Sequence, residues 1–71
     1  MQMEDPVNKS KAISIISLET GYGRRVIENK MDELANQGKI TIFPDPGDKR
    51  IILLSRDDVQ VIIQSLRKGS S

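Results

Sequence analysis

The 71-residue sequence contains no cysteine and no histidine. Without cysteine, the chain can form neither a disulfide nor a thiolate metal site. Without histidine, it lacks a common zinc ligand and the usual general base near neutral pH. The carboxylates stand in no recognisable catalytic motif, so nothing indicates an enzyme active site. We therefore expect no enzyme activity, no metal site, no cofactor and no small-molecule ligand.

The sequence also lacks a strong excess of charge and any long apolar run. Its 11 Lys and Arg residues stand against 10 Asp and Glu residues, which leaves a net charge of +1. A clearly basic domain is typical of nucleic-acid binders, so composition alone does not indicate one and the positions of the charges must decide. No apolar run approaches the roughly 18 residues of a membrane span, and no charged-then-apolar leader is present. We expect a cytoplasmic protein.

The short chain predicts one small domain. Residues 1–9 are interpreted as a flexible lead-in, residues 10–68 as the folded domain and residues 69–71 as a tail or linker remnant. A domain of this size buries a modest core, so its stability is expected to be low without further support. Because disulfides and thiolate metal sites are excluded, dimerisation is the remaining common support. A homodimer is therefore our hypothesis.

The chain is organised around residues 13–39, which predict two helices joined by a sharp corner at residues 20–23. Gly21 lies in this corner, where a glycine lets the backbone turn without a steric penalty from a Cβ atom. Either Asn8 or Ser10 could cap the first helix, because each offers a side-chain oxygen to the first free amides.

The segment at residues 12–18 has an ambiguous pattern. Ile13 and Ile15 alternate with a serine as in a strand, whereas Ile13 and Ile16 follow helical spacing. The β-branched residues favour a strand. We predict a helix, because the glycine corner and the following helix give this segment a packing partner.

The second helix is predicted over residues 24–37. Ile27, Met31 and Leu34 are spaced i, i+4 and i+7, so they form one apolar stripe that should face the core. Gly38 should close the helix in the left-handed conformation. The side opposite the stripe carries polar residues: Arg25, Asn29, Asp32 and Asn36.

Two apolar runs, at residues 40–43 and 49–54, flank a turn-forming cluster at residues 44–48 and predict a β-hairpin. Ser55 should cap a last helix, and Val61 lies off the inward stripe of that helix. The stripe residues are Val59, Ile62, Ile63 and Leu66. The predicted fold class is mainly α with a small β-hairpin, in the order helix, helix, hairpin, helix.

The segment SLETGYGRRVIENKMDEL resembles the helix-turn-helix of bacterial and archaeal regulators. Ile16 takes the buried position of the support helix, and Gly21 takes the turn glycine. Ile27 takes the buried aliphatic position of the recognition helix. The sequence departs from the usual pattern at Thr20, Gly23 and Lys30.

The following segment, MDELANQGKITIFPDPGDKRIILLS, resembles the recognition-helix end and the wing of MarR-type regulators. In those proteins a helix ending in Leu-x-x-x-Gly leads to a wing that contains Asp-Pro and a basic pair. The order of elements is closer to the MerR and excisionase group, where the helix after the wing begins much as LLSRDDVQVI does here. The resemblance covers roughly residues 12–68. It implies a compact winged helix-turn-helix, in the order helix, helix, two-stranded wing, helix.

The resemblance further implies that the second helix enters the major groove of double-stranded DNA, with the wing along the backbone or minor groove. Arg24 and Arg25 are expected to reach base edges, where an arginine fork can bind two acceptors of guanine. Asn29 lies one turn further along and is expected to pair with adenine. The residues expected to contact phosphates are Tyr22, Lys30, Lys49 and Arg50.

Each of these assignments has a simpler interpretation. The two arginines could be a solvated helix start, although arginine at that end opposes the helix dipole. Lys49 and Arg50 could be a solvated hairpin edge that discourages sheet-to-sheet pairing. Glu28, Asp32 and Glu33 argue against DNA contact, because carboxylates repel phosphates unless they face away or accept from cytosine.

The function that best fits the resemblance is sequence-specific binding of double-stranded DNA. The protein would be a small transcriptional regulator or an excisionase-like architectural factor in a bacterial or archaeal cytoplasm, associated with the nucleoid. The alternative is a winged-helix module that binds another protein and no DNA. The near-neutral charge and the carboxylates of the second helix favour this alternative.

Overall fold

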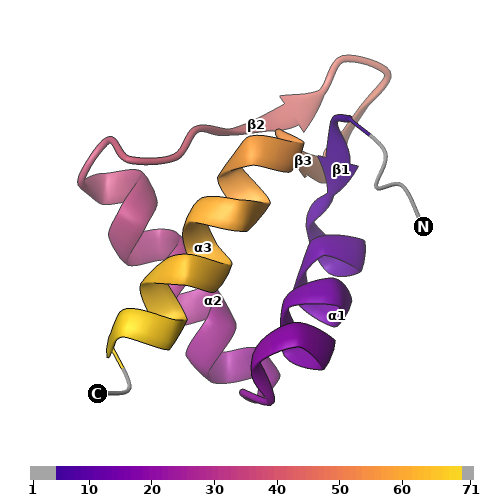
Figure 1. The fold of residues 1–71 in the computed structure, drawn as a ribbon. Helices are drawn as coiled ribbons and strands as arrows, with labels where there is room; N and C mark the ends of the chain where they lie inside the picture. The colour runs from indigo at the N-terminus through magenta and orange to yellow at the C-terminus, as the bar shows by residue number, and fades with distance from the viewer. Residues whose placement is uncertain (1–4, 70–71) are drawn as a thin grey trace.

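A computed structural model describes residues 5–69 as three helices with a small antiparallel sheet (Figure 1). In chain order the elements are β1 (Val7–Asn8), α1 (Lys9–Thr20), α2 (Arg24–Asn36), β2 (Ile42–Asp45), β3 (Asp48–Leu54) and α3 (Arg56–Gly69). The predicted fold class is confirmed, because a β-hairpin lies between the second and third helices. This order is compatible with a winged helix-turn-helix. Residues 1–4 of the predicted lead-in and residues 70–71 of the predicted tail lie outside the described residues.

The strand β1 was missed by the sequence prediction. It pairs antiparallel with β3, with Val7 opposite Leu54, and makes β3 the central strand in the order β1-β3-β2. Val7 is fully buried. A single valine in a polar segment has no periodicity that could predict a strand. β1 and the first residue of α1 therefore fall inside residues 1–9, the segment interpreted as a lead-in.

The ambiguous first segment is helical, as predicted. Ala12, Ile13 and Ile16 are buried on one side of α1, so the helical spacing and not the alternation describes this segment. Of the two candidate caps, Asn8 is the one used: its Oδ1 atom accepts a hydrogen bond from the amide of Ser10 at 2.8 Å.

The corner between α1 and α2 depends on Gly21. Its φ angle is +80°, in the left-handed region, and its amide donates to the carbonyl oxygen of Ser17 at 2.8 Å. The hydroxyl of Ser17 donates to the carbonyl oxygen of Tyr22 at 2.9 Å, which holds the corner against α1. Gly23 has an extended backbone and begins α2.

The predicted apolar stripe of α2 is confirmed, since its members are all buried: Ile27, Met31 and Leu34. The helix ends one residue before the predicted Gln37. Gly38 has a φ angle of +75°, and its amide donates to the carbonyl of Ala35 at 3.1 Å. The amide of Lys39 donates to the carbonyl of Leu34 at 2.9 Å. These two bonds are the Schellman pattern that a left-handed glycine closes.

The predicted hairpin is confirmed, but the boundaries of its strands were wrong. We predicted a first strand at residues 40–43 and a turn at residues 44–48, whereas β2 begins two residues later and the turn occupies residues 46–47. Ile40 lies in the hydrophobic core before the strand begins. Pro44 is part of β2, which is an edge strand, the place in a sheet where proline is tolerated.

The last helix matches its predicted cap and inward stripe. The hydroxyl of Ser55 accepts from the amide of Asp58 at 3.1 Å. The stripe is buried: Val59, Ile62, Ile63 and Leu66. Val61, which lies off the stripe, is 37% exposed. Among the described residues, no helix combines the length and the hydropathy needed to cross a membrane.

We expect Gly21→Ala to lower the free energy of unfolding by roughly 1–2 kcal/mol, because a side chain disfavours the left-handed backbone there. An added Cβ at Gly21 meets no atom within 4 Å, so the cost is conformational only. Gly23→Ser is the control: its extended backbone accepts any residue, and a serine hydroxyl there can cap α2, so we expect stabilisation by about 0.5 kcal/mol. Urea unfolding measures the free energy of unfolding of both variants. Equal changes in Gly21→Ala and Gly23→Ser would show that the left-handed backbone of Gly21 is not what makes this glycine necessary.

Candidate nucleic-acid interface

The outward face of α2 forms a shallow, open depression of mixed charge. The residues that line it are Arg24, Arg25, Glu28, Asn29 and Asp32. Because the apolar stripe on the other side of α2 is buried, the helical repeat of about 100° per residue turns this side toward solvent. The depression brings together the side chains that the sequence predicted to reach base edges.

The two arginines at the start of α2 differ in their contacts. Arg24 donates from Nε to Oε1 of Glu28 at 3.0 Å, and 71% of the Arg24 side chain is exposed. Arg25 is exposed and forms no hydrogen bond or ion pair within residues 5–69. The helix start itself has no side-chain cap, since Gly23 offers none.

The remaining members of the depression, Asn29 and Asp32, are also exposed. Within the part of the chain that the structure describes, neither side chain forms a hydrogen bond or ion pair. The carboxylates of Glu28 and Asp32 balance the two arginines of the depression. This face can therefore offer directed donors and acceptors, but little net positive charge.

Lys30, a predicted phosphate contact, lies on the flank of α2 and not in the depression. Its Nζ atom is 2.8 Å from Oε2 of Glu33, and 25% of its side chain is exposed. The hydrogen bond from Lys30, and then its charge, lower the pKa of Glu33 below its ordinary value of 4.5. Any phosphate contact by Lys30 must compete with this carboxylate.

Tyr22, another predicted phosphate contact, is partly buried and packs against the core. Its amide donates to Oγ1 of Thr20 at 3.3 Å, and its carbonyl accepts from Ser17. The backbone of Tyr22 is therefore part of the corner between α1 and α2.

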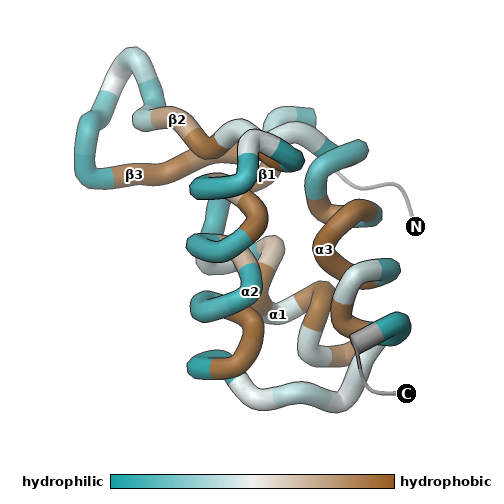
Figure 2. Tube along the Cα trace, turned by 90° about the vertical axis from the view of Figure 1, so that its left-hand side faces the viewer, coloured by the Kyte–Doolittle hydropathy of each residue, from teal (hydrophilic) through white to brown (hydrophobic). Residues whose placement is uncertain are grey.

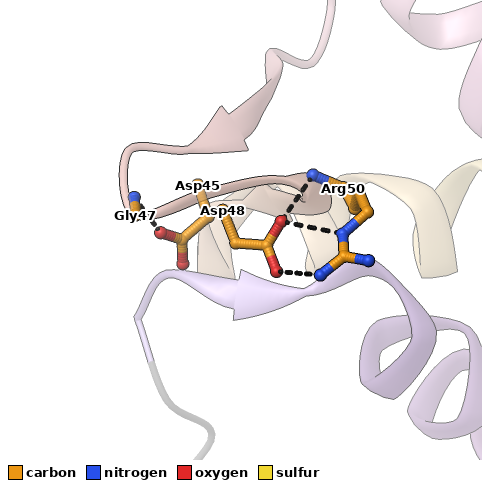
Figure 3. A network of polar contacts seen from close by, with 4 residues as sticks. All are labelled: Asp45, Gly47, Asp48 and Arg50. Carbon is orange, nitrogen blue, oxygen red and sulfur yellow. Dashed lines mark hydrogen bonds and ion pairs between the residues drawn. The ribbon is translucent and has the colours of Figure 1, made fainter.

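The tip of the hairpin is ordered by two aspartates (Figure 3). Oδ1 of Asp45 accepts from the amide of Gly47 at 2.6 Å. Asp48 accepts from the amide, Nε and Nη2 of Arg50 at 3.0, 3.3 and 3.4 Å. These bonds from Arg50 lower the pKa of Asp48. Lys49 is exposed and has no ion pair within the described residues. Of the two predicted phosphate contacts in the hairpin, it is therefore the one that does not have to break an ion pair first.

A second open depression was not anticipated from the sequence. It lies along α1 beside the start of α2 and is lined by Ser10, Ile13, Ser14, Ser17, Leu18 and Arg24. Leu18 is 88% exposed. Helical spacing from Ile13 and Ile16 already places Leu18 off the buried stripe, which was the available signal. Arg24 lines both depressions and so stands at the boundary between them.

The hairpin and the hydrophilic edge of α2 lie on the same side of the molecule (Figure 2). In this view the hairpin projects beyond the helices on that side, and α3 lies on the opposite side. A straight, rod-shaped ligand could thus meet α2 and the hairpin together. No cluster of acidic residues within residues 5–69 is suited to hold a metal ion.

We expect Lys30→Ala to raise the pKa of Glu33 toward 4.5, because the hydrogen bond and the charge that lower it are lost. The folded-state pKa is the depressed one, so the pair contributes stability above pH 4.5 and loses that contribution as the pH falls through the lowered value. A carboxyl NMR titration measures the shift. Lys49→Ala is the control that should leave Glu33 unchanged, and an unshifted Glu33 in Lys30→Ala would refute the pairing.

Comparisons of the chain with models of protein families, with curated proteins and with solved structures found no match. The functional interpretation therefore depends on the geometry of α2, the helix corner and the hairpin.

Proposed function

We propose that this protein is a winged helix-turn-helix that binds double-stranded DNA in a sequence-specific manner. The observation that carries the proposal is the exposed polar face of α2, which begins with two arginines and lies on the side of the molecule where the hairpin projects (Figure 2). The arginines stand at the end of α2 away from the hairpin. In the proposed complex α2 enters the major groove and the hairpin, as the wing, follows the backbone or the minor groove. The protein would act as a small transcriptional regulator or as an excisionase-like architectural factor.

The chemistry of the depression on α2 suits base edges. The groove is about 12 Å wide and admits an α-helix. Arg24 and Arg25 carry planar forks that match the two acceptors of guanine, and Asn29 can both donate to and accept from adenine. All three side chains belong to the first turns of α2, the part of a recognition helix that contacts bases.

Contacts with the DNA backbone are proposed mainly for Lys49 at the hairpin tip. Arg50 and Lys30 can also reach phosphates, but each must first release its own carboxylate partner. Because two of the proposed phosphate contacts are paired with carboxylates, few counterions should be released, so binding to random DNA should be weak and only modestly dependent on salt. Discrimination between sequences then depends on the base contacts of α2.

A homodimer is part of the proposal. A small domain without disulfides gains from a partner, and two copies would double the contacts with DNA. Exposed apolar side chains of several elements are available for such a contact: Leu18, Val26, Phe43 and Val61. Selection of bound duplexes from a random library tests this, since a dimer enriches paired half-sites about one helical turn apart. Sedimentation at micromolar concentration reports the mass directly.

A protein-binding module is the second candidate function. It is favoured by the balanced charges of the depression on α2 and by Leu18, which is 88% exposed beside it. An apolar side chain with this exposure suits a protein partner better than a phosphate backbone. A mobility-shift assay with random duplex at low salt separates the two, because a module of this kind should show no shift even at tens of micromolar protein.

We expect Arg25→Ala to weaken binding to the selected DNA site by roughly 1–3 kcal/mol, which is typical of a base-contacting arginine. Binding to a scrambled duplex should change much less. Fluorescence anisotropy with both duplexes measures the difference. Lys68→Ala, in the last turn of α3, also removes one positive charge and serves as the control.

We expect Lys49→Ala to weaken binding to all sequences alike and to reduce the slope of log affinity against log salt by about 1, as loss of one phosphate contact requires. Titrations at several salt concentrations give that slope. If both Arg25→Ala and Lys49→Ala bind DNA as the parent does, these residues are not the interface.

A further inference from the structure

The contact between Arg24 and Glu28 occupies only one edge of the guanidinium. Nε of Arg24 donates to Oε1 of Glu28 at 3.0 Å across one turn of α2. No other atom within residues 5–69 bonds to this guanidinium, so the edge formed by its two terminal nitrogens is free. The side chains are 71% and 39% exposed, so the free edge is open to solvent.

The hydrogen bond from Nε to Glu28 fixes the orientation in which Arg24 presents its terminal nitrogens. A guanidinium is planar, so a carboxylate on Nε restricts both the rotamers of the chain and the rotation of the plane. The free edge then presents two parallel N–H donors, which is the geometry that the O6 and N7 acceptors of guanine require. Part of the side-chain freedom that binding must remove is therefore already restricted in the free protein.

The other exposed arginines of the candidate interface do not share this arrangement. Arg25 has no partner within the described residues and is not oriented. Arg50 donates from both Nε and Nη2 to Asp48, so one of its terminal nitrogens is already used. Arg24 alone combines an oriented guanidinium with a free terminal edge among these three.

We propose that Glu28 is a positioning residue for Arg24 and that Arg24 reads a guanine through its terminal nitrogens. This inference rests on the proposed binding of DNA. Glu28 then has two opposite effects on DNA binding. It increases specificity by orienting Arg24, and it lowers affinity because its carboxylate, which lines the depression, repels phosphates. Loss of Glu28 should therefore strengthen binding to random DNA while weakening the preference for guanine.

Asp32 provides a matched control. It lines the same depression, carries the same charge and forms no ion pair within residues 5–69. Removal of either carboxylate should raise affinity for random duplex through lost repulsion. Only removal of Glu28 should affect base preference, because only Glu28 holds an arginine.

The experiment begins with selection of bound duplexes from a random library by the parent protein. Competition binding then measures the preference at every position of the selected site for the parent, Arg24→Ala, Glu28→Ala, Asp32→Ala and the double variant Arg24→Ala with Glu28→Ala. Arg24→Ala should abolish the preference at one guanine, a loss of roughly 5- to 100-fold. Glu28→Ala should reduce the preference at that same guanine by roughly 2- to 10-fold, the entropic cost of ordering one long side chain.

Two outcomes separate positioning from a general structural role. In the Arg24→Ala background, Glu28→Ala should have no further effect on base preference. Asp32→Ala should leave the preference unchanged. The inference is overturned if Glu28→Ala keeps the full preference for guanine, if it reduces preference equally without Arg24, or if Asp32→Ala reduces preference to the same extent.

Failure of the proposed function gives a different result. If the parent binds no duplex, or enriches no sequence from the library, specific DNA binding is wrong and the role of Glu28 falls with it. If the parent enriches a site but Glu28→Ala behaves as Asp32→Ala does, DNA binding stands and the positioning role alone is refuted. Circular dichroism confirms folding of each variant.

Discussion

Burial of one apolar stripe on α2 is the constraint on which the rest of this structure depends. Ile27, Met31 and Leu34 are buried where α2 packs against α1 and α3. Exposing any one of them costs about 1.5–3 kcal/mol, so α2 cannot rotate about its axis. Since each residue advances about 100° around the helix, the same packing directs Arg25, Asn29 and Asp32 to solvent. Arg24 lies nearer the edge of the buried stripe and is exposed as the first residue of α2.

The charges of the candidate interface are largely neutralised within the chain. Each of three basic side chains has a carboxylate partner close in sequence: Arg24 with Glu28, Lys30 with Glu33 and Arg50 with Asp48. Exposed pairs of this kind contribute little to stability. Their larger effect is on binding, because they weaken sequence-independent attraction to phosphates and orient individual donors. In the proposed complex with DNA, such a surface would favour discrimination between sequences over affinity for any duplex.

Helices were predicted well because their signal is local. The stripes of α2 and α3 and the glycine corner all follow from spacing within one or two turns. The hairpin was predicted, but its strand boundaries were wrong. Residues 44–48 are typical turn residues, so they were assigned to the turn, although an edge strand such as β2 tolerates Pro44. β1 was missed, since Val7 becomes a strand residue only by pairing with Leu54, far along the chain.

The sequence alone determined α2 and α3, their inward faces and the polar composition of the α2 surface, whereas the pattern of α1 was ambiguous between helix and strand. It also contained the spacing of Arg24 and Glu28, four residues apart on one helix, which allows their pairing. Only the tertiary structure decided that the hairpin projects on the side of that surface and that β1 adds a third strand to the sheet. Periodicity reports which side of an element is buried, whereas the relative directions of two elements depend on long-range packing that no local pattern encodes.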